Sequence, residues 1–374
     1  MREQGKTVKK NQYKKPNLIS RQQKGSSVRI IFTLICVSFG FFLVVLSTSS
    51  QDNSKQPKDT GLDPFGMEGV EETVEDCGTF LNEGSLAKGT PVIYFVTPTY
   101  HRPVQVPELL RIGQTLLLST NIHWIVVEDS SKCSDVVRKT LKDIGIPHTH
   151  LSAPLPSAYK SANIKPRGVS GRRAALKWIR KNAKADGIVY FGDDDNTYHR
   201  RIFAEIRSTV NISIFPVGLV PDYLLSSPIV KEGHVIGFYD PWIVDRLFPV
   251  DMAGFAVSVR LIRDHPEANI PYVAGYEEDR FIQSLDVTYK DLEPKASNCT
   301  EIFVWHTKTV QVNPVDLKKG ENLEVYNLKE LLKELNSVGD VGWSSKGKKA
   351  TIFWTAGLNG DENEVKHCNF FRCV

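Results

Sequence analysis

The stretch from Ile188 to Tyr198 constrains the fold more than any other part of the chain. It begins as an apolar run with β-branched and aromatic side chains and ends in Gly192 and three aspartates, Asp193–Asp195. Such a run is typical of a strand that is buried on both faces. Three carboxylates at its end require a positive partner, and we predict a divalent cation such as Mg²⁺ or Mn²⁺. A solvated acidic turn is the alternative that this stretch alone leaves open.

Strands and helices alternate in the sequence that leads to this stretch. Apolar runs predict strands at 92–96, 122–127 and 148–151, and helical spacing predicts helices at 109–118, 136–144 and 169–181. This alternation indicates an α/β fold with a parallel sheet and right-handed crossovers. Three of the strands end in polar clusters, at Thr97–Tyr100, Glu128–Asp129 and Asp193–Asp195. In a parallel sheet these clusters converge on one edge.

The second half of the chain has a mixed pattern. We predict strands at 212–220, 234–239, 253–259 and 302–305, helices at 202–206 and 277–285, and a tail helix at 328–335. This half should form the second wall of a cleft.

The basic residues are concentrated at the N-terminus. Residues 1–29 contain nine lysines and arginines and one acid, while the 374-residue chain has a net charge of only +4. The rest is therefore acidic overall, which gives no support for nucleic-acid binding. Residues 30–50 are uncharged and mostly apolar, and the basic flank predicts a type II signal anchor. A cleaved signal peptide is the competing interpretation, but no clear cleavage site follows the apolar run.

Residues 51–90 are polar, contain proline and glycine, and show no periodicity, so we predict a flexible stem. Sequons at Asn211 and Asn298 fit a lumenal main domain. Five cysteines follow the anchor, at positions 77, 133, 299, 368 and 373. Since this number is odd, we predict that Cys77, in the stem, is the best candidate for a bridge to a second chain. Cys368 and Cys373 could form a local pair.

A series of motifs carries a specific resemblance. In order they are Thr97–Tyr100, Lys165–Arg173, Phe191–Tyr198, Phe248–Val257, Gly275–Glu278, Asp291–Pro294 with Asn298–Thr300, and Val304–Thr307. In type, order and rough spacing they resemble the β1,3-glucuronyltransferases, glycosyltransferase family 43. The resemblance covers about 91–309, and the anchor and stem also match the family's type II Golgi layout.

The resemblance implies a GT-A fold, with a parallel UDP- and metal-binding half at 91–198 and a mixed acceptor-binding half at 199–309. The C-terminal extension, 310–374, is longer than the tail of the family's proteoglycan-linker enzyme and does not match it. The family also implies Mn²⁺ as cofactor, UDP-glucuronate as donor, a galactose-terminated acceptor, inversion at the anomeric carbon, a Golgi membrane location and a homodimer.

The resemblance assigns roles to individual residues. Asp195 would ligate Mn²⁺, and Glu278 would be the catalytic base. Arg246 and Asp251 would contact the acceptor. From its residue type alone, Trp242 is a core or lid aromatic or a candidate for stacking on the galactose of the acceptor. Donor contacts would come from Pro98, Thr99, Tyr100, Asp129, Arg167, Arg172, Asp193, Asp194, His306, Thr307 and Lys308.

The position of the base depends on the register. One extra residue between Gly275 and Asp291 leaves Asp279 as a rival, and Glu277 is a second neighbour. Alignment from Gly275 favours Glu278. A carboxylate at a helix N-terminus is held ionised by backbone N–H groups, so we expect a low pKa for this base.

Two residues differ from those of the family's vertebrate members, one at the donor site and one at the acceptor site. Lys308 stands where they carry arginine, which removes a planar fork for phosphate. Ser226 lies near the position of an acidic acceptor contact of the linker enzyme, a difference that concerns the identity of the acceptor and not the donor chemistry. We predict glucuronyl transfer to the galactosyl-galactosyl-xylosyl linker of proteoglycans. N-acetyllactosamine-type glycan ends, a catalytically silent sugar-binding relative and a metal-dependent phosphotransferase are the alternatives.

Overall fold

The computed structural model describes residues 72–81, 89–162, 165–220, 224–240 and 244–309, with short pieces at 316–317, 331 and 349–350. The predicted anchor at 30–50, Trp242, the Cys368–Cys373 pair and nearly all of the predicted tail helix lie outside these residues. Among the residues described, no helix is both long and apolar enough to cross a bilayer.

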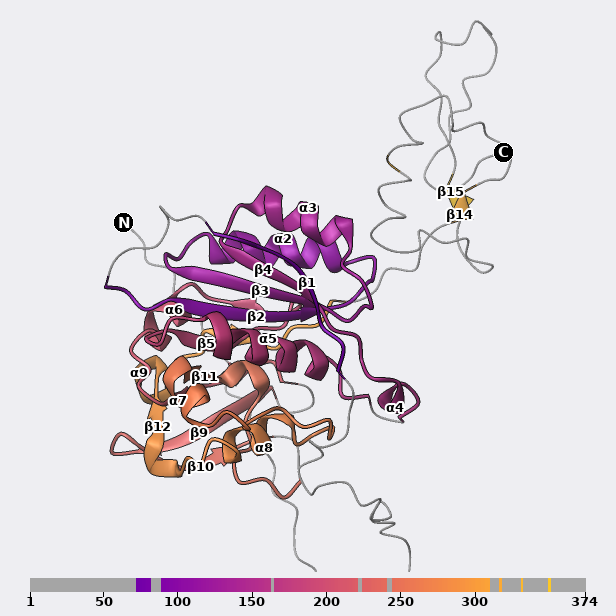
Figure 1. The fold of residues 1–374 in the computed structure, drawn as a ribbon. Helices are drawn as coiled ribbons and strands as arrows, with labels where there is room; N and C mark the ends of the chain where they lie inside the picture. Colours follow the sequence, from indigo (N-terminus) through magenta and orange to yellow (C-terminus); the bar gives the residue numbers. More distant parts are fainter. Residues whose placement is uncertain are drawn as a thin grey trace, which may run out of the picture. The chain divides into compact units, whose positions relative to one another are not determined.

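An eight-stranded sheet forms the centre of the fold, in the order β1-β4-β3-β2-β5-β11-β7-β12 (Figure 1). The predicted parallel arrangement of β2 to β5 is confirmed, whereas β1 and β11 run antiparallel to their neighbours and β12 runs parallel to β7. The strands are β1 (Glu75–Phe80), β2 (Ile93–Thr99), β3 (Ile122–Glu128), β4 (His148–Ser152), β5 (Ile188–Phe191), β7 (Ile212–Ile214), β11 (Phe255–Ser258) and β12 (Leu292–Pro294).

Alternating side chains of this sheet enter two separate cores. Ile93 and Phe95 of β2 belong to one hydrophobic cluster, and Tyr94 and Val96 belong to the other. Residues of α2 (Gln105–Leu116), α3 (Asp135–Ile144) and α6 (Arg201–Ile206) complete the first cluster. Residues of α5 (Val169–Asn182), α7 (Val259–Asp264) and α8 (Glu277–Gln283) complete the second. Figure 1 shows α2 and α3 on one side of the sheet and α5 on the other. Apolar side chains on both faces of β2 explain why it reads as a continuous apolar run.

A second sheet has the order β10-β9-β8-β13-β6. Its strands are β6 (Thr197–Tyr198), β8 (Val217–Gly218), β9 (Leu225–Lys231), β10 (His234–Tyr239) and β13 (Val304–Trp305). The short elements are α4 (Ser157–Lys160), α9 (Ala296–Cys299), the 3₁₀ turns η1 (Met252–Gly254) and η2 (Tyr289–Asp291), and a parallel pair of β14 (Asp316–Leu317) and β15 (Lys349–Ala350).

The single strand predicted at 212–220 is two strands. β7 belongs to the eight-stranded sheet and β8 to the five-stranded sheet. They are separated by Phe215 and Pro216, and proline cannot donate the N–H that a continuous central strand would need. This break carries the chain from one sheet to the other.

The prediction of an unstructured stem up to residue 90 is wrong for residues 75–80. These residues form β1, which pairs with β4 from Glu75↔Ser152 to Phe80↔His148. Cys77 forms a disulfide with Cys133 of the same chain. The predicted bridge from Cys77 to a second chain is therefore also wrong. Pairing with β4 satisfies the backbone of a polar segment that shows no hydrophobic periodicity of its own.

The end of β5 requires glycine at position 192. A Cβ atom built on Gly192 would lie 2.0 Å from Cζ of Phe95, whose ring is fully buried. Gly192→Ala must therefore displace the ring or the strand end, and we expect the free energy of unfolding to fall by about 1–3 kcal/mol. Urea denaturation of the purified protein measures this change.

Gly237→Ala is the matched control for this substitution. Its Cβ would meet only Cδ1 of Ile229, at 3.9 Å. Gly237→Ala should therefore leave the urea midpoint nearly unchanged, and equal losses of stability in the two variants would contradict the packing argument.

Candidate functional site

The strand order creates a ligand-binding position between β2 and β5. The chain moves from β2 to β3 and β4 on one side, and β5 lies on the other side of β2. Ligands bind at such a reversal, outside the carboxyl ends of the strands. The polar clusters after β2 and β5 meet there, because the Thr99 hydroxyl donates to Oδ2 of Asp194 at 2.7 Å. The predicted convergence of these strand ends is confirmed.

Asp194 is held on both of its carboxylate oxygens by protein groups. Besides the bond from Thr99, its Oδ1 lies 2.7 Å from Nη2 of Arg102, and both side chains are buried. Gln105 donates to the Thr99 hydroxyl at 3.2 Å. Arg102 and Gln105 were not predicted as site residues. The available signal was their position directly after the polar cluster that ends β2.

Asp193 forms an ion pair with Arg172 in the first turns of α5. Arg172 also donates to the carbonyl of Arg167 at 3.3 Å. Gly168, with φ of 73°, turns the chain into this helix, and a Cβ there would lie only 2.6 Å from Nη1 of Arg172. The side chain of Arg167 is exposed. The helix start therefore presents one buried and one exposed guanidinium near the carboxyl edge of the sheet.

Asp195 is held by its backbone, while its carboxylate accepts no hydrogen bond from the residues that the structure describes. Its carbonyl accepts from Nη2 of Arg111 at 2.9 Å and from the Thr307 hydroxyl. Burial raises the pKa of its carboxyl, and the charges of Asp193 and Asp194 raise it further. An ionised carboxylate in this position lacks a partner.

A divalent cation suits the Asp195 carboxylate. Within the described residues, no group of three His, Cys, Asp or Glu side chains is arranged to hold a metal ion. Mg²⁺ and similar hard cations are commonly bound by one or two carboxylates together with substrate phosphates and waters. The donor set thus fits a cation that binds with a phosphate-bearing ligand, and it does not fit a closed structural site.

His306 brings the second sheet to this site. Its Nδ1 donates to Oδ2 of Asp251 at 2.8 Å. This hydrogen bond raises the pKa of His306 to about 9, with further contributions from the charges of Asp251, Asp193 and Asp195 that outweigh burial. His306 is therefore a cation at neutral pH. Of its neighbours, Thr307 is half-buried and Lys308 is exposed.

The structure separates the roles of Glu278 and Asp279. Asp279 is buried, and its carboxylate accepts from the backbone N–H of Phe248 and from Gln283 Nε2, both at 2.7 Å. Glu278 is half-buried and interacts electrostatically with Asp251 and Arg172. Asp279 therefore supports the packing of α8, whereas Glu278 shares the electrostatic environment of the site.

The expectation of a low pKa for Glu278 is wrong. Burial, together with the charges of Glu277 and Asp251, raises its pKa from 4.5 to about 8. Its own backbone N–H and Arg172 act in the opposite direction, but they are the weaker effects. The helix N-terminus is thus outweighed by two neighbouring carboxylates and by the loss of solvent.

The predicted acceptor residues Arg246 and Asp251 lie in two separate polar groups. Nη2 of Arg246 lies 2.5 Å from Oδ1 of Asp240, and Ser226 donates to Oδ2 of Asp240 at 2.5 Å. Asp251 accepts from His306 and also from the backbone N–H of Ala253 at 2.9 Å. Asp251 thus links the predicted donor side to the predicted acceptor side.

The remaining predicted nucleotide residues lie at the ends of β2 and β3. Pro98 belongs to β2, and the Tyr100 ring is 40% exposed, with the Arg102 guanidinium 4.4 Å from its centroid. The backbone N–H of Asp129 donates to the Thr99 carbonyl at 2.8 Å. These contacts join the two strand ends into one surface.

The two sequons differ in exposure. Asn298 is exposed, in the turn Ala296–Cys299, whose residues all have positive φ values of 54–61°. Asn211 is half-buried directly before β7. Asn298 is thus the more accessible of the two acceptor side chains.

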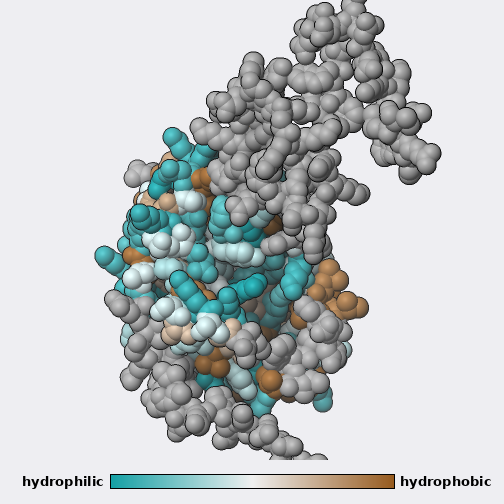
Figure 2. Space-filling model, turned by 90° about the vertical axis from the view of Figure 1, so that its right-hand side faces the viewer, coloured by the Kyte–Doolittle hydropathy of each residue, from teal (hydrophilic) through white to brown (hydrophobic). Residues whose placement is uncertain are grey.

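The face at the carboxyl ends of the parallel strands is mostly hydrophilic. Figure 2 views the molecule from the side on which α4 lies in Figure 1, and the coloured surface there is predominantly polar with smaller hydrophobic patches. A polar, charged ligand fits such a face better than an apolar one.

Comparison with known proteins gives consistent matches. The profile of Glycosyltransferase family 43 matches residues 112–310. A Drosophila melanogaster protein named galactosylgalactosylxylosylprotein 3-beta-glucuronosyltransferase S is 42% identical over 324 residues, which is 83% of this chain and 78% of that protein. The Homo sapiens protein named galactosylgalactosylxylosylprotein 3-beta-glucuronosyltransferase 2 is 43% identical over 230 residues, which is 60% of this chain and 71% of that protein.

Among solved structures, the galactosyltransferase LgtC in complex with donor and acceptor sugar analogs is similar with a TM-score of 0.37 and 11% identity. The match covers 67% of this chain and 97% of LgtC.

Proposed function

Because this chain belongs to glycosyltransferase family 43, we propose that it transfers glucuronic acid from UDP-glucuronate to the 3-hydroxyl of a terminal galactose, with inversion and with Mn²⁺ as cofactor. The acceptor that we propose is the galactosyl-galactosyl-xylosyl linker of a protein, which is the substrate that the relatives' names state. A GT-A arrangement of the two sheets is part of this proposal.

The observation that carries the proposal is the meeting of three kinds of group at one sheet edge. Asp195 offers a carboxylate that accepts no hydrogen bond from the described residues, Arg172 and protonated His306 offer positive charge, and Glu278 offers a base. Asp195 and His306 follow β5 and β13, whereas Arg172 and Glu278 lie in the first turns of α5 and α8. Transfer from a nucleotide sugar needs this combination, because a diphosphate leaves while a hydroxyl attacks.

The proposed mechanism uses these residues in separate roles. Asp195 would hold Mn²⁺, which when bound supplies a Lewis acid for the diphosphate oxygens. Arg172 and His306 stabilise the negative charge that develops on the leaving UDP. Glu278 accepts the proton of the acceptor 3-hydroxyl as its oxygen bonds to the anomeric carbon. A single displacement with one base inverts that carbon.

We also propose a Golgi membrane location with the type II anchor at 30–50 and a lumenal main domain. A homodimer remains part of the proposal. Since Cys77 is paired with Cys133 of the same chain, the dimer interface would have to form without the intermolecular disulfide that was predicted from the sequence.

The proposal predicts a specific combination of donor and acceptor. Purified full-length protein with Mn²⁺ should transfer from UDP-glucuronate to a galactosyl-galactosyl-xylosyl acceptor, and UDP-glucose should support much slower transfer because it lacks the carboxylate that the cations would recognise. Mass spectrometry of the product and UDP release measure this.

A panel of acceptors separates the alternatives. Faster transfer to an N-acetyllactosamine-type end would contradict the proposed acceptor and would leave the proposed donor unaffected. Equal rates with UDP-glucose and UDP-glucuronate would contradict the donor, and UDP binding without release would indicate a silent sugar-binding relative.

A further inference from the structure

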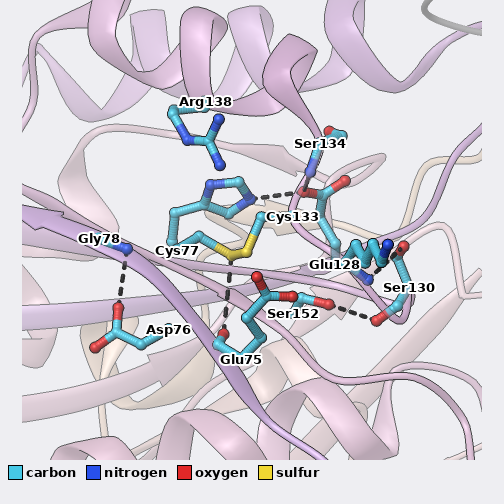
Figure 3. Close-up of a disulfide and its surroundings, with 12 residues drawn as sticks. Glu75, Asp76, Cys77, Gly78, Glu128, Ser130, Cys133, Ser134, Arg138 and Ser152 are labelled. Atoms are coloured by element: carbon cyan, nitrogen blue, oxygen red, sulfur yellow. Dashed lines mark hydrogen bonds and ion pairs between the residues drawn. A yellow bond between two sulfur atoms is a disulfide. The ribbon is translucent and has the colours of Figure 1, made fainter.

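The loop after β3 is tied to the segment that precedes the predicted catalytic domain. We define the Asp129 loop as residues 129–134. Cys133 of this loop forms the disulfide with Cys77 of β1, with the two Cα atoms 5.7 Å apart and a sequence separation of 56 (Figure 3). β1 itself pairs with β4, and in that register Gly78 lies opposite His150. The loop is thus cross-linked to an edge strand.

A buried hydrogen-bonded pair, Glu128 and His150, lies next to the loop. Oε1 of Glu128 accepts from Nε2 of His150 at 2.6 Å and from the backbone N–H of Ser134 at 2.9 Å. The Glu128 and His150 side chains are only 3% and 2% exposed. Burial alone would raise the pKa of Glu128, but the bonds from His150 and Ser134 lower it overall, so the carboxylate is ionised. Figure 3 shows Glu128 and Ser134 together with the disulfide.

Both ends of the loop are fixed. At its start, the N–H of Asp129 donates to the Thr99 carbonyl at 2.8 Å, and Oδ1 of Asp129 accepts from the N–H of Leu155 at 2.7 Å. At its end, the Ser134 hydroxyl caps α3 by accepting from the N–H of Val137 at 3.3 Å. Oδ1 of Asp129 is thus occupied, whereas its Oδ2 accepts no hydrogen bond from any residue whose position is described, and the side chain is exposed. Tethers at both ends restrict where that oxygen can lie.

We propose that the Cys77–Cys133 disulfide and the Glu128–His150 pair are positioning groups that hold Asp129 in place for the nucleotide of the donor. This inference rests on the proposed function, which places a uridine nucleotide at the ends of β2 and β3. It makes β1 a part of the donor site, and it makes nucleotide affinity depend on the oxidation state of the disulfide. A ligand-binding group that is held in place by its surroundings binds more tightly than one that must be ordered on binding.

The test is calorimetric titration of full-length protein with UDP and Mn²⁺, at a temperature at which circular dichroism shows every variant folded. Cys77→Ser with Cys133→Ser should raise the dissociation constant of UDP about tenfold. The KM for the donor should rise in parallel, while the KM for the acceptor and kcat at saturating donor stay near the wild-type values. Cys299→Ser is the matched control, because Cys299 is not in a disulfide and lies in α9. It should leave UDP binding unchanged.

Reduction provides a second arm that needs no substitution. Wild-type protein treated with a reductant should acquire the UDP affinity of the double variant, and the reductant should have no further effect on that variant. Glu128→Gln keeps the shape of the side chain and weakens the bonds to His150 and Ser134, so it should raise the UDP dissociation constant by a smaller factor.

Two results would overturn the inference. The first is wild-type UDP affinity in the folded double variant. The second is an equal change in donor KM and acceptor KM, which would indicate a general loss of structure. Absence of UDP binding in the wild-type protein is a separate outcome, which would refute the proposed function itself.

Discussion

Replacing Asp195 by alanine is expected to abolish transfer and to leave the folded domain intact. The backbone carbonyl of Asp195 is held by Arg111 and Thr307, and these bonds survive the substitution. The pKa of its carboxyl is raised in the folded protein. An acid with a raised folded-state pKa binds its proton more tightly when folded, so its ionised form weakens folding once the pH exceeds the unfolded pKa. At neutral pH the thermal midpoint should therefore stay the same or rise slightly.

The loss of activity should be about 10³-fold or more, because the metal and its ligand stabilise the charge of the leaving diphosphate. Initial rates over a Mn²⁺ titration measure this loss, and calorimetry with UDP present should show that Mn²⁺ binding is lost as well. Full turnover of the variant in the presence of a chelator would refute the metal site.

Asp194→Asn is the informative comparison. Asp194 is buried against Arg102 and Thr99. Breaking such a buried pair costs about 3–5 kcal/mol, so this variant should lose stability, in contrast to Asp195→Ala.

Sequence reasoning predicts well those strands whose own residues show an apolar pattern. The residues of β2, β3 and β5 are apolar on both faces, so each strand is recognisable without knowledge of its neighbours. β1, with the sequence EDCGTF, is different. It has no apolar face of its own and becomes a strand through pairing with β4 and through Cys133. β9 contains Ser226, Ser227 and Pro228, and it was missed for a similar reason.

The candidate site shows the same division. The run of aspartates was recognisable, but their different environments depend on contacts with residues that are distant in sequence. The partner of Asp194 is Arg102, and the partner of Asp193 is Arg172. The resemblance assigns the metal to Asp195, but only these tertiary contacts show that, among the described residues, its carboxylate is the one of the three that accepts no hydrogen bond. The disulfide partner of Cys77 is likewise a question of spatial proximity, and an odd number of cysteines cannot answer it.

Glu278→Gln is expected to reduce kcat by about 10²-fold or more while leaving the affinity for UDP nearly unchanged. Glutamine keeps the size of the side chain and cannot accept the proton of the acceptor hydroxyl. The pKa of Glu278 is raised to about 8. Between pH 4.5, the ordinary pKa of a glutamate, and pH 8, its pKa in the folded protein, the free energy of unfolding therefore falls as the pH rises. A neutral glutamine should be at least as stable as the wild type at pH 8, so a loss of kcat with an unchanged thermal midpoint assigns the effect to chemistry.

The control is Asp279→Asn, which should have the opposite profile. Its carboxylate holds the N–H of Phe248 and Gln283 Nε2 in a buried position. The substitution should therefore lower the thermal midpoint and change kcat much less. If Asp279→Asn were inactive and Glu278→Gln active, the catalytic base would be Asp279. That result would contradict the separation of roles seen in the structure.

The pH dependence of the wild-type enzyme provides an independent test of the same base. A carboxylate with a pKa of about 8 is ionised in about one molecule in a hundred at pH 6. Since kcat/KM reports the ionisation of the free enzyme, it should rise about tenfold per pH unit from pH 6 to 7, bend near pH 8, and fall again above about pH 9, where His306 loses its proton. Glu278→Gln should lose this rise and retain a low rate that is flat below about pH 8. A wild-type profile that is already level at pH 6 would show that the base titrates near its ordinary value, and that bound ions or Arg172 outweigh the charges of Glu277 and Asp251 in the working enzyme.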